Sequence, residues 1–347
     1  MITEDLPKLA ASVIVDHDQR KCPLCADPYS EVWMEAPDRF NGRREQYRLL
    51  RCAACELVWL HAPPLESEMG NHYGPDYDRT IANAAKASDH WSGRRDELHR
   101  LKPDGGAVLD LGCASGGFLR TLEGLSWNLF GIEMSEEAAK VARDRCGAEV
   151  FVGSILDAPF PPNSFDAITC FNVLEHVYEP KEVLSRVSNW LKPGGVFITM
   201  MPNVDSAGAY IFRSYWYALE LPRHLYHFSP TTLNMLAKSV GLQEVFIKAE
   251  RDLYFERSVG YIKDEALRKL GIMRHPAKQS REPRLAWKVL RKSFRLTLLP
   301  VITAVASLAG DGEMIYAVFA KNSASDSVTA TSQNELKVGM QQSELHL

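Results

Sequence analysis

Val108-Leu-Asp-Leu-Gly-Cys-Ala-Ser-Gly-Gly-Phe118 is the stretch of sequence that decides how this chain folds. Its apolar beginning, residues 107–111, predicts a buried strand, and the glycines that follow predict a tight turn into a helix. Because glycine has no side chain, such a turn lets the backbone approach a nucleotide-like ligand closely. The glycines stand at Gly112, Gly116 and Gly117, which is not the G-x-G-x-x-G spacing of dinucleotide-binding proteins. This spacing favours a smaller adenosyl ligand over a dinucleotide and counts against a dehydrogenase.

Strands and helices alternate from Lys102 onward. Expected strands cover 107–111, 127–132, 149–152, 166–171, 195–201, 243–249 and 314–320. Expected helices include 116–124, 135–146, 180–191 and 230–240. The alternation predicts an α/β, Rossmann-like fold with a mostly parallel seven-stranded sheet and helices on both faces. The last strand follows a long break, which makes it a candidate for antiparallel insertion at an edge of the sheet.

Composition and charge narrow the class of protein further. The chain has 347 residues, 46% of them hydrophobic, and a net charge of −4. This length accommodates one large domain with one or two small modules, and the charge shows no overall bias toward nucleic acid. Residues 1–20 lack the apolar core of a secretory signal, and no apolar run reaches the ~18 residues that a membrane span needs. We therefore expect a cytoplasmic protein.

Four of the seven cysteines form two C-x-x-C pairs, Cys22–Cys25 and Cys52–Cys55. In a cytoplasmic protein this spacing is typical of zinc rather than of disulfides. Two such pairs complete a tetrahedral site with no open position, so the expected zinc is structural. Residues 21–62 are too few to build a core alone, and they predict a zinc ribbon whose metal supplies folding energy. The remaining cysteines are expected to be small core residues: Cys113, Cys146 and Cys170.

The predicted organisation is a leader, the zinc ribbon, a helical connector, a large domain in two segments, a basic helical insertion or lid over the acceptor pocket, and a polar, disordered tail. Their ranges are 1–20, 21–62, 63–100, 101–250 with 313–321, 251–312 and 322–347. The insertion is unusual, because residues 251–295 carry 13 lysines and arginines against 5 acidic residues. An apolar segment follows at 296–309, which is too short to span a bilayer but long enough to lie on one.

Five stretches, in order, resemble the motifs of class I S-adenosylmethionine-dependent methyltransferases. They are Asp110–Gly116, Gly131–Met134, Val152–Ile155, Phe165–His176 and Leu191–Phe197. The resemblance covers about residues 70–250 and the last strand. It implies an enzyme that uses S-adenosylmethionine as a methyl donor, and it agrees with the adenosyl ligand favoured by the glycine spacing.

The resemblance also implies which residues bind the cofactor. Glu133 would accept hydrogen bonds from the ribose hydroxyls, although Ser135-Glu-Glu137 beside it also looks like an ordinary helix start. Asp110 would orient the glycine loop or hold the amino group of the cofactor. Ser154 stands where family members often carry an aspartate for the adenine. The full implied set is Asp110, Gly112, Ala114, Gly116, Glu133, Met134, Ser154, Ile155, Phe171, Asn172 and Tyr73, with Tyr77 as a second tyrosine that closes over the cofactor.

The segment Glu220-Leu-Pro-Arg-His-Leu-Tyr-His-Phe-Ser-Pro230 is the candidate for acceptor binding and proton removal. It follows the expected strand 195–201 and opens onto the carboxyl edge of the sheet, where ligands bind in such folds. His224 is the first candidate base, since a histidine pKa near neutrality suits that role, and His227 is the second. His176 is a candidate contact near the sulfonium. The plainer alternative is that these histidines only pack around the helix that begins after Ser229.

The acceptor is expected to be a small molecule or a glycan, methylated on oxygen or carbon. The stretch between Cys25 and Cys52 lacks a basic stripe, and Phe171-Asn-Val-Leu replaces the N-P-P-Y type segment of nucleic-acid amino methyltransferases. One alternative is an rRNA or tRNA methyltransferase that binds RNA through its ribbon. Another is methylation of a lipid-linked acceptor, with peripheral contact to the inner membrane face through 284–310. A third is a domain that binds the cofactor without catalysis.

Overall fold

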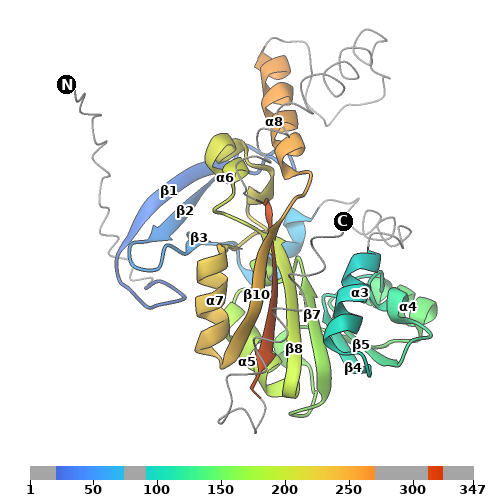
Figure 1. Ribbon diagram of the computed structural model, residues 1–347. Helices are drawn as coiled ribbons and strands as arrows, with labels where there is room; N and C mark the ends of the chain where they lie inside the picture. The colour runs from blue at the N-terminus through green and yellow to red at the C-terminus, as the bar shows by residue number, and fades with distance from the viewer. Residues whose placement is uncertain (1–20, 74–90, 270–311, 323–347) are drawn as a thin grey trace, which may run out of the picture.

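A seven-stranded mixed sheet organises most of the structure (Figure 1). The computed structural model describes residues 21–73, 91–269 and 312–322. Within these residues the strand order is β10-β11-β8-β7-β4-β5-β6. The strands are β4 (Gly106–Leu111), β5 (Trp127–Glu133), β6 (Glu149–Val152), β7 (Phe165–Phe171), β8 (Leu191–Pro202), β10 (Leu242–Glu250) and β11 (Met314–Lys321).

Parallel pairing dominates this sheet and confirms the predicted α/β class. β4 pairs in parallel with β5 on one side and β7 on the other, and β6 and β8 continue the parallel order outward. β4 is central because its apolar side chains need cover on both faces: Val108, Leu109 and Leu111 are fully buried. The carboxyl ends of β4, β5, β6 and β7 therefore meet at one edge of the sheet.

The last strand is antiparallel as expected, but it does not lie at an edge. β11 inserts between β8 and β10, and it pairs antiparallel with both, so β10 is the edge strand. The reason is visible in its side chains, since every residue from Met314 to Phe319 is buried. A strand that is apolar on both faces is stabilised by neighbours on both sides, and an edge position would leave one backbone edge without partners.

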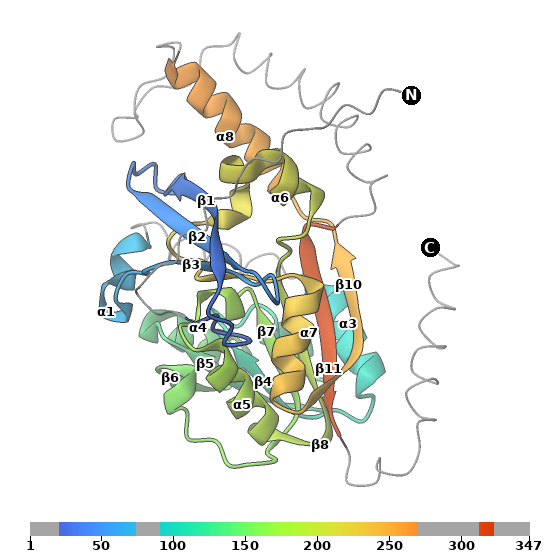
Figure 2. The same cartoon turned by 90° about the vertical axis from the view of Figure 1, so that its left-hand side faces the viewer.

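Helices cover both faces of the sheet (Figures 1 and 2). Leu109 and Leu111 of β4 share a core cluster with apolar residues of α5 and α7, whereas Val108 shares a second cluster with residues of α3 and α4. This division follows from the alternation of side chains along a strand. The helices are α3 (Ser92–Leu101), α4 (Glu136–Cys146), α5 (Pro180–Trp190) and α7 (Pro230–Ser239).

The helix expected over 116–124 is largely absent. The structure has turns there and a single 3-10 helix, η3 (Leu119–Leu122). Gly116 has a φ of +75°, and a Cβ atom added to it would lie 3.1 Å from the Cα atom of Ala142 in α4. Gly116 thus serves close packing against α4 rather than helix formation, and Gly124, with a φ of +75°, ends the segment.

A second, four-stranded sheet contains the predicted ribbon and one strand that the sequence did not indicate. Its order is β1-β2-β3-β9. The first three are β1 (Ser30–Pro37), β2 (Gln46–Cys52) and β3 (Val58–Leu60). β9 (Tyr226–His227) comes from the candidate acceptor segment and pairs antiparallel with β3. The ribbon is therefore hydrogen-bonded directly to the segment that carries two of the candidate histidines.

Short helices lie in the connections between the strands of these sheets. α1 (Glu66–Met69) and η1 (Gly70–His72) follow β3, η4 (Ile155–Asp157) follows β6, and η5 (Leu174–His176) follows β7. α6 (Ala207–Phe212), η6 (Arg213–Tyr215) and η7 (Tyr217–Leu219) lie between β8 and β9. α8 (Tyr254–Lys269) belongs to the predicted basic insertion and lies above α6 in Figure 1.

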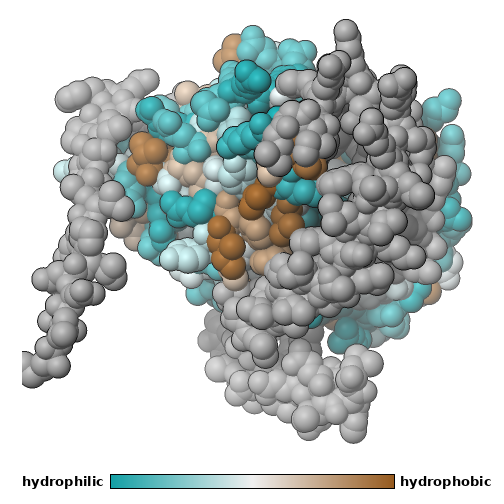
Figure 3. All heavy atoms as spheres, turned by 90° about the horizontal axis from the view of Figure 1, so that it is seen from above, coloured by the Kyte–Doolittle hydropathy of each residue, from teal (hydrophilic) through white to brown (hydrophobic). Residues whose placement is uncertain are grey.

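Hydrophilic side chains cover much of the described surface seen from above, with a small group of apolar side chains among them (Figure 3). In the part of the chain that the structure describes, no helix is both long and apolar enough to cross a membrane. The segment expected to contact a membrane, 284–310, lies outside the described residues, as do the leader 1–20, the tail from 323 onward and Tyr77.

Asp166 at the start of β7 provides a test of how this sheet is held. Its Oδ2 atom accepts hydrogen bonds from the amide of Ala107 at 2.8 Å and from Lys192 Nζ at 2.7 Å. Partial burial acts to raise the pKa of Asp166, but these two donors outweigh it and lower that pKa below the usual 3.8. The ionised side chain therefore stabilises the fold above the unfolded-state pKa, and this contribution is lost as the pH falls through the folded-state value.

We expect Asp166→Asn to lower the free energy of unfolding by about 1 kcal/mol at pH 7. The difference from the unsubstituted protein should shrink toward pH ~2, as the pH falls through the lowered folded-state pKa of Asp166 and its side chain becomes neutral. Urea unfolding at the two pH values measures this. Asp144→Asn, at an exposed position of α4, is the matched control and should change little. A deficit that is the same at both pH values would contradict the explanation.

Candidate functional site

The turn after β4 can be formed only with glycine at its first position. Gly112 has a φ of +66°, and a Cβ atom added there would lie 2.5 Å from Val173 Cγ2. Both the backbone conformation and the close approach of the segment after β7 therefore exclude a side chain. Ala114, two residues later, also has a positive φ, +47°. The turn is thus held in a strained shape against the carboxyl end of β7.

Glu133, the last residue of β5, holds this turn in place. Its Oε2 atom accepts a hydrogen bond from the amide of Ala114 at 2.9 Å, and its Oε1 atom accepts one from the amide of Ser135 at 2.9 Å. Ser135, and not Glu133, caps α4, because the Ser135 hydroxyl accepts a hydrogen bond from the amide of Ala138. Each carboxylate oxygen has a further lone pair, so Glu133 retains the capacity to accept hydrogen bonds from a ligand.

Asp110 lies beneath the same turn. It is buried, and its Oδ1 atom accepts a hydrogen bond from Thr169 Oγ1 at 2.7 Å, which joins β4 to β7 by side chains as well as by backbone. Burial raises the pKa of Asp110 to about 7. Because Asp110 is buried and bound to Thr169, its environment fits a role in orienting the loop better than a role as a solvent-exposed charge.

The other predicted cofactor residues lie at the ends of β5, β6 and β7, along the same edge. Ser154 caps η4 by accepting a hydrogen bond from the amide of Leu156, and Met134 is exposed. Phe171 is buried and stacks on Trp91, with 5.3 Å between ring centroids. Asn172 is exposed and has a φ of +55°. The remaining members of the set are Gly116 in the turn after β4, Ile155 in η4, and Tyr73, which follows η1.

The structure brings the three candidate histidines together. The rings of His176 and His224 are 4.6 Å apart between centroids, and those of His224 and His227 are 6.1 Å apart. His176 Nδ1 donates to the carbonyl of Arg223 at 3.0 Å, and His224 Nδ1 donates to the carbonyl of Ala218 at 2.8 Å. These bonds fix the neutral tautomer in which Nε2 carries the lone pair.

The pKa values of these histidines differ from the near-neutral value that the sequence led us to expect. Burial lowers the pKa of His176 to about 4 and that of His227 to about 3, and it also lowers the pKa of His224. All three rings are therefore neutral at pH 7. Neutral imidazoles act through their lone pairs, as hydrogen-bond acceptors or as metal ligands.

Glu175 lies beside the candidate histidines, although the sequence analysis did not select it. It is 2% exposed, and neither carboxylate oxygen has a hydrogen-bond partner among the described residues. Burial raises its pKa to about 8. One oxygen of Glu175, one nitrogen of His176 and one nitrogen of His224 all lie within 4.8 Å of one another. The sequence feature that could have identified Glu175 is the Glu-His pair directly after a buried strand.

Arg223 and Glu220 are the charged residues beside the candidate histidines. Arg223 is buried and forms an ion pair with Glu220, and its guanidinium lies 3.8 Å from the ring centroid of Phe40 in the ribbon. The ring of Tyr73 lies 5.4 Å from the same group. Tyr73, expected to cover the cofactor, is therefore positioned beside the candidate acceptor segment. The contribution of Phe40 could not be inferred from the sequence, because it depends on how the ribbon docks.

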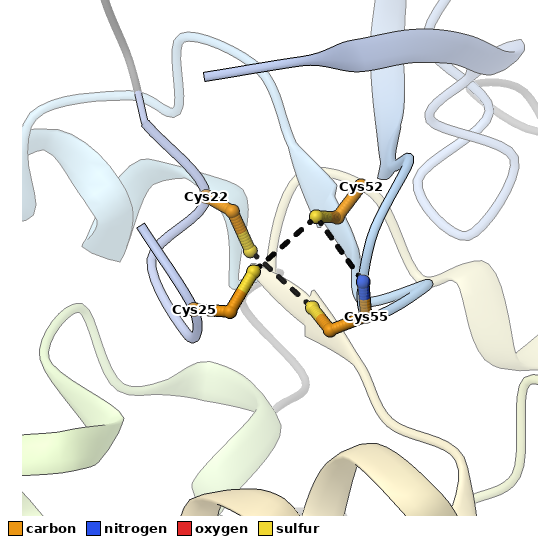
Figure 4. Close-up of side chains that lie close together, drawn as sticks. All are labelled: Cys22, Cys25, Cys52 and Cys55. Atoms are coloured by element: carbon orange, nitrogen blue, oxygen red, sulfur yellow. Dashed lines mark hydrogen bonds between the residues drawn. The ribbon is translucent and has the colours of Figure 1, made fainter. Parts of the chain in front are cut away.

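The four paired cysteines converge in the ribbon (Figure 4). Cys22 Sγ lies 3.5 Å from Cys55 Sγ, and Cys25 Sγ lies 3.5 Å from Cys52 Sγ. Two thiolates bound to one zinc at 2.3 Å with tetrahedral angles would be about 3.8 Å apart, so the four residues fit a zinc ion. The two knuckles are alike, since the residue after each pair has a positive φ: +61° at Ala26 and +66° at Glu56.

Comparisons with known proteins identify the family. Residues 84–245 match a family model described as a methyltransferase domain. A ubiquinone biosynthesis O-methyltransferase of Xanthomonas oryzae pv. oryzae is 30% identical over 181 residues, which are 46% of this chain and 74% of that protein. The chain belongs to the S-adenosylmethionine-dependent methyltransferases. The predicted Rossmann-like methyltransferase fold is thereby confirmed.

Two further methyltransferases define the extent of the similarity. A ubiquinone biosynthesis O-methyltransferase of Xanthomonas axonopodis pv. citri is 33% identical over 156 residues, 42% of this chain, and the match spans 65% of that protein, just under two thirds. A solved phosphoethanolamine N-methyltransferase 2 of Haemonchus contortus, in complex with S-adenosyl-L-methionine, has a TM-score of 0.51 at 18% identity. That match covers 85% of this chain and 69% of the other, and it shows a shared fold.

The cysteine cluster makes a prediction about metal content. The purified protein should hold about one zinc per chain, and Cys25→Ser should lose that zinc on dialysis because one of four thiolate ligands is removed. Elemental analysis measures the zinc directly. Cys146→Ser, which changes a buried cysteine of α4 outside the cluster, is the control and should keep the metal. Equal zinc in both variants would contradict the site.

Proposed function

We propose that this methyltransferase transfers the methyl group of S-adenosylmethionine to a hydroxyl oxygen of a small-molecule acceptor. One observation carries the proposal: the β4 turn with Glu133 and the cluster of Glu175 with the histidines lie at the same edge of one sheet. A methyl donor and an acceptor oxygen held by these two groups would meet over the end of β7. The relatives named O-methyltransferase support oxygen as the accepting atom.

The donor half of the proposed site is built from backbone and from one carboxylate. S-adenosylmethionine, when bound, supplies a methyl group that its sulfonium already activates. Glu133 accepts hydrogen bonds from the ribose hydroxyls with its remaining lone pairs. The turn from Gly112 to Gly116 offers backbone amides to the methionine part, and Asp110 holds the shape of the turn through Thr169. Met134, Ser154, Ile155, Phe171 and Asn172 are the further proposed contacts of the cofactor, with Ser154 and Ile155 beside the adenine.

The acceptor half is built from the segment that precedes α7. His224 and His176 keep their Nε2 lone pairs for the acceptor, because their Nδ1 atoms are held by backbone carbonyls. These groups accept a hydrogen bond from the acceptor hydroxyl and hold its oxygen in line with the methyl group, and His227 supports the ring of His224 from the side. The proton passes to water as the new C–O bond forms. Arg223 and Tyr73 border this space and orient the rest of the acceptor.

The ribbon serves the acceptor site in this proposal. Its strand β3 pairs with β9, and the amide of Leu60 donates to the carbonyl of Leu225 at 2.8 Å. Phe40 of the ribbon packs on Arg223. Zinc held by the four cysteines would stabilise this sheet and, through it, the position of His224. A structural support of this kind favours a small-molecule acceptor over an RNA that binds to a separate ribbon.

Glu133→Gln tests the donor half. The substitution keeps the shape of the side chain but removes its charge, and we expect the affinity for S-adenosylmethionine to fall about 10- to 100-fold. Isothermal titration calorimetry measures it. The control is Glu137→Gln, at an exposed position of the neighbouring helix, which should bind the cofactor normally. Undiminished affinity in Glu133→Gln would refute the assigned role.

His224→Ala tests the acceptor half. We expect transfer of labelled methyl groups to a panel of small phenols, catechols and sugars to fall at least about 10²-fold, because misplacing the reacting hydroxyl costs that much. Affinity for S-adenosylmethionine should be retained. His99→Ala, at an exposed position of α3, is the matched control. Transfer at the normal rate in His224→Ala would remove this residue from the mechanism.

A further inference from the structure

Three side chains with metal-binding atoms converge at the carboxyl end of β7. Glu175 and His176 belong to η5, and His224 comes from the segment before β9. We propose that these three residues bind one divalent transition-metal cation, at a site separate from the four cysteines. We further propose, on the basis of the proposed function, that this cation holds the acceptor oxygen.

The hydrogen bonds of the two histidines are those of metal ligands. A histidine that binds a metal through one ring nitrogen normally donates the other N–H to a carbonyl or carboxylate, which fixes the ring and the tautomer. His176 and His224 both do this, through Nδ1, to the carbonyls of Arg223 and Ala218. Each ring keeps its Nε2 lone pair for a ligand, and one nitrogen of each ring lies within 4.8 Å of the other and of a Glu175 oxygen. Two rings prepared in the same way within one small cluster point to a common ligand.

Glu175 provides the second, independent observation. Its carboxylate is almost fully buried and without a hydrogen-bond partner among the described residues, which is rare for a native protein. Protonation would remove the charge but would leave an O–H donor and its acceptors equally unpaired. The neighbouring cation, Arg223, is engaged by Glu220 in an ion pair. A metal ion bound by Glu175 would satisfy the buried carboxylate.

The donor set indicates which cations fit. Two imidazole nitrogens and one carboxylate suit Mn²⁺, Fe²⁺, Co²⁺ or Zn²⁺, whereas Mg²⁺ and Ca²⁺ prefer oxygen ligands throughout. Glu220 is close enough to contribute through a water molecule, since its Oε2 lies 3.6 Å from His224 Nε2. Three protein ligands leave coordination positions open, as in catalytic rather than structural sites.

Such an ion would explain how a site with only neutral histidines prepares an oxygen nucleophile. An acceptor hydroxyl bound to the cation becomes more acidic, because the metal stabilises the oxygen anion. Its proton can pass to water or to Glu220, and the oxygen then attacks the methyl carbon while the C–S bond breaks. The methyl group moves from sulfur to oxygen and the proton leaves the oxygen, so the reaction needs no further reactant.

Mn²⁺ binding to the zinc-loaded protein tests the metal site without reference to activity. Zinc fills the cysteine site first, and Mn²⁺ does not displace it from thiolates. We expect the electron paramagnetic resonance signal of free Mn²⁺ to titrate to one bound ion per chain. Pulsed measurements on the bound ion should show couplings to directly coordinated imidazole nitrogen in the unsubstituted protein. Absence of bound Mn²⁺ up to about 1 mM, or bound Mn²⁺ without nitrogen couplings, would overturn the proposal.

Substitutions then assign the ligands. Glu175→Gln and His224→Gln should each weaken Mn²⁺ binding at least about tenfold, whereas His99→Gln should bind Mn²⁺ normally. Far-ultraviolet circular dichroism and zinc content verify that each variant is folded. Unchanged Mn²⁺ affinity in both site variants would place the ion elsewhere and refute the assignment.

Measuring methyl transfer with and without added metal distinguishes this inference from the proposed function. If transfer requires Mn²⁺ or a similar cation beyond the structural zinc, both are supported. If transfer proceeds fully without a second metal, the role of the ion at the acceptor oxygen is refuted while the proposed function stands. If Mn²⁺ binds at the assigned ligands but no acceptor hydroxyl is methylated, the metal site stands and the proposed function fails.

Discussion

The parallel pairing of β4 with β5 and β7 is the constraint on which the rest of the structure depends. It forces three strands to end at one edge and brings Gly112, Glu133 and Glu175 into one region from distant parts of the sequence. Side chains reinforce the pairing, since Thr169 donates to Asp110 across it and Glu133 holds the amide of Ala114. The donor and acceptor halves of the proposed site therefore meet at one edge of the large sheet, which would align them.

The ribbon extends this edge and makes it specific to this chain. A two-residue strand, β9, would be marginal on its own, but it completes a sheet that begins in the ribbon. The same segment carries the buried His224 and His227, and Arg223 lies between the ribbon side chain Phe40 and Tyr73. Folding of the ribbon, with its proposed zinc, is thus coupled to the geometry of the acceptor site. A substitution of one of the four cysteines, although far from the reacting atoms, would therefore alter the geometry of the acceptor site.

Much of this arrangement could be predicted from the sequence, and the part that could not has physical reasons. The strands of the large sheet, such as 149–152, were predicted to within a few residues because buried strands are apolar runs bounded by turns. The spacing of the cysteines predicted their convergence because ligand spacing is local. The helix over 116–124 was wrong, since Gly116 serves packing against α4.

Other features depend on contacts between distant segments and have no local signal. The apolar sequence of β11 predicts a strand but not its place in the sheet. Its pairing with β8 and β10 is what puts it inside the sheet. β9 is two residues long and has no strand pattern until β3 is beside it. Burial of the histidines, which shifts their pKa values well below neutrality, is likewise a property of the assembled fold.

The electrostatics of the site follow from that burial. Three neutral imidazoles cannot balance the carboxylate of Glu175, and Arg223 already balances Glu220. The enclosed space therefore has more negative than positive potential whenever Glu175 is ionised, and low polarity around it strengthens every interaction. A cation is the species that such a space binds best, and the inferred metal ion meets this requirement. The charge that makes Glu175 unfavourable in the unliganded protein is therefore the charge that would hold the metal ion and, through it, the acceptor oxygen.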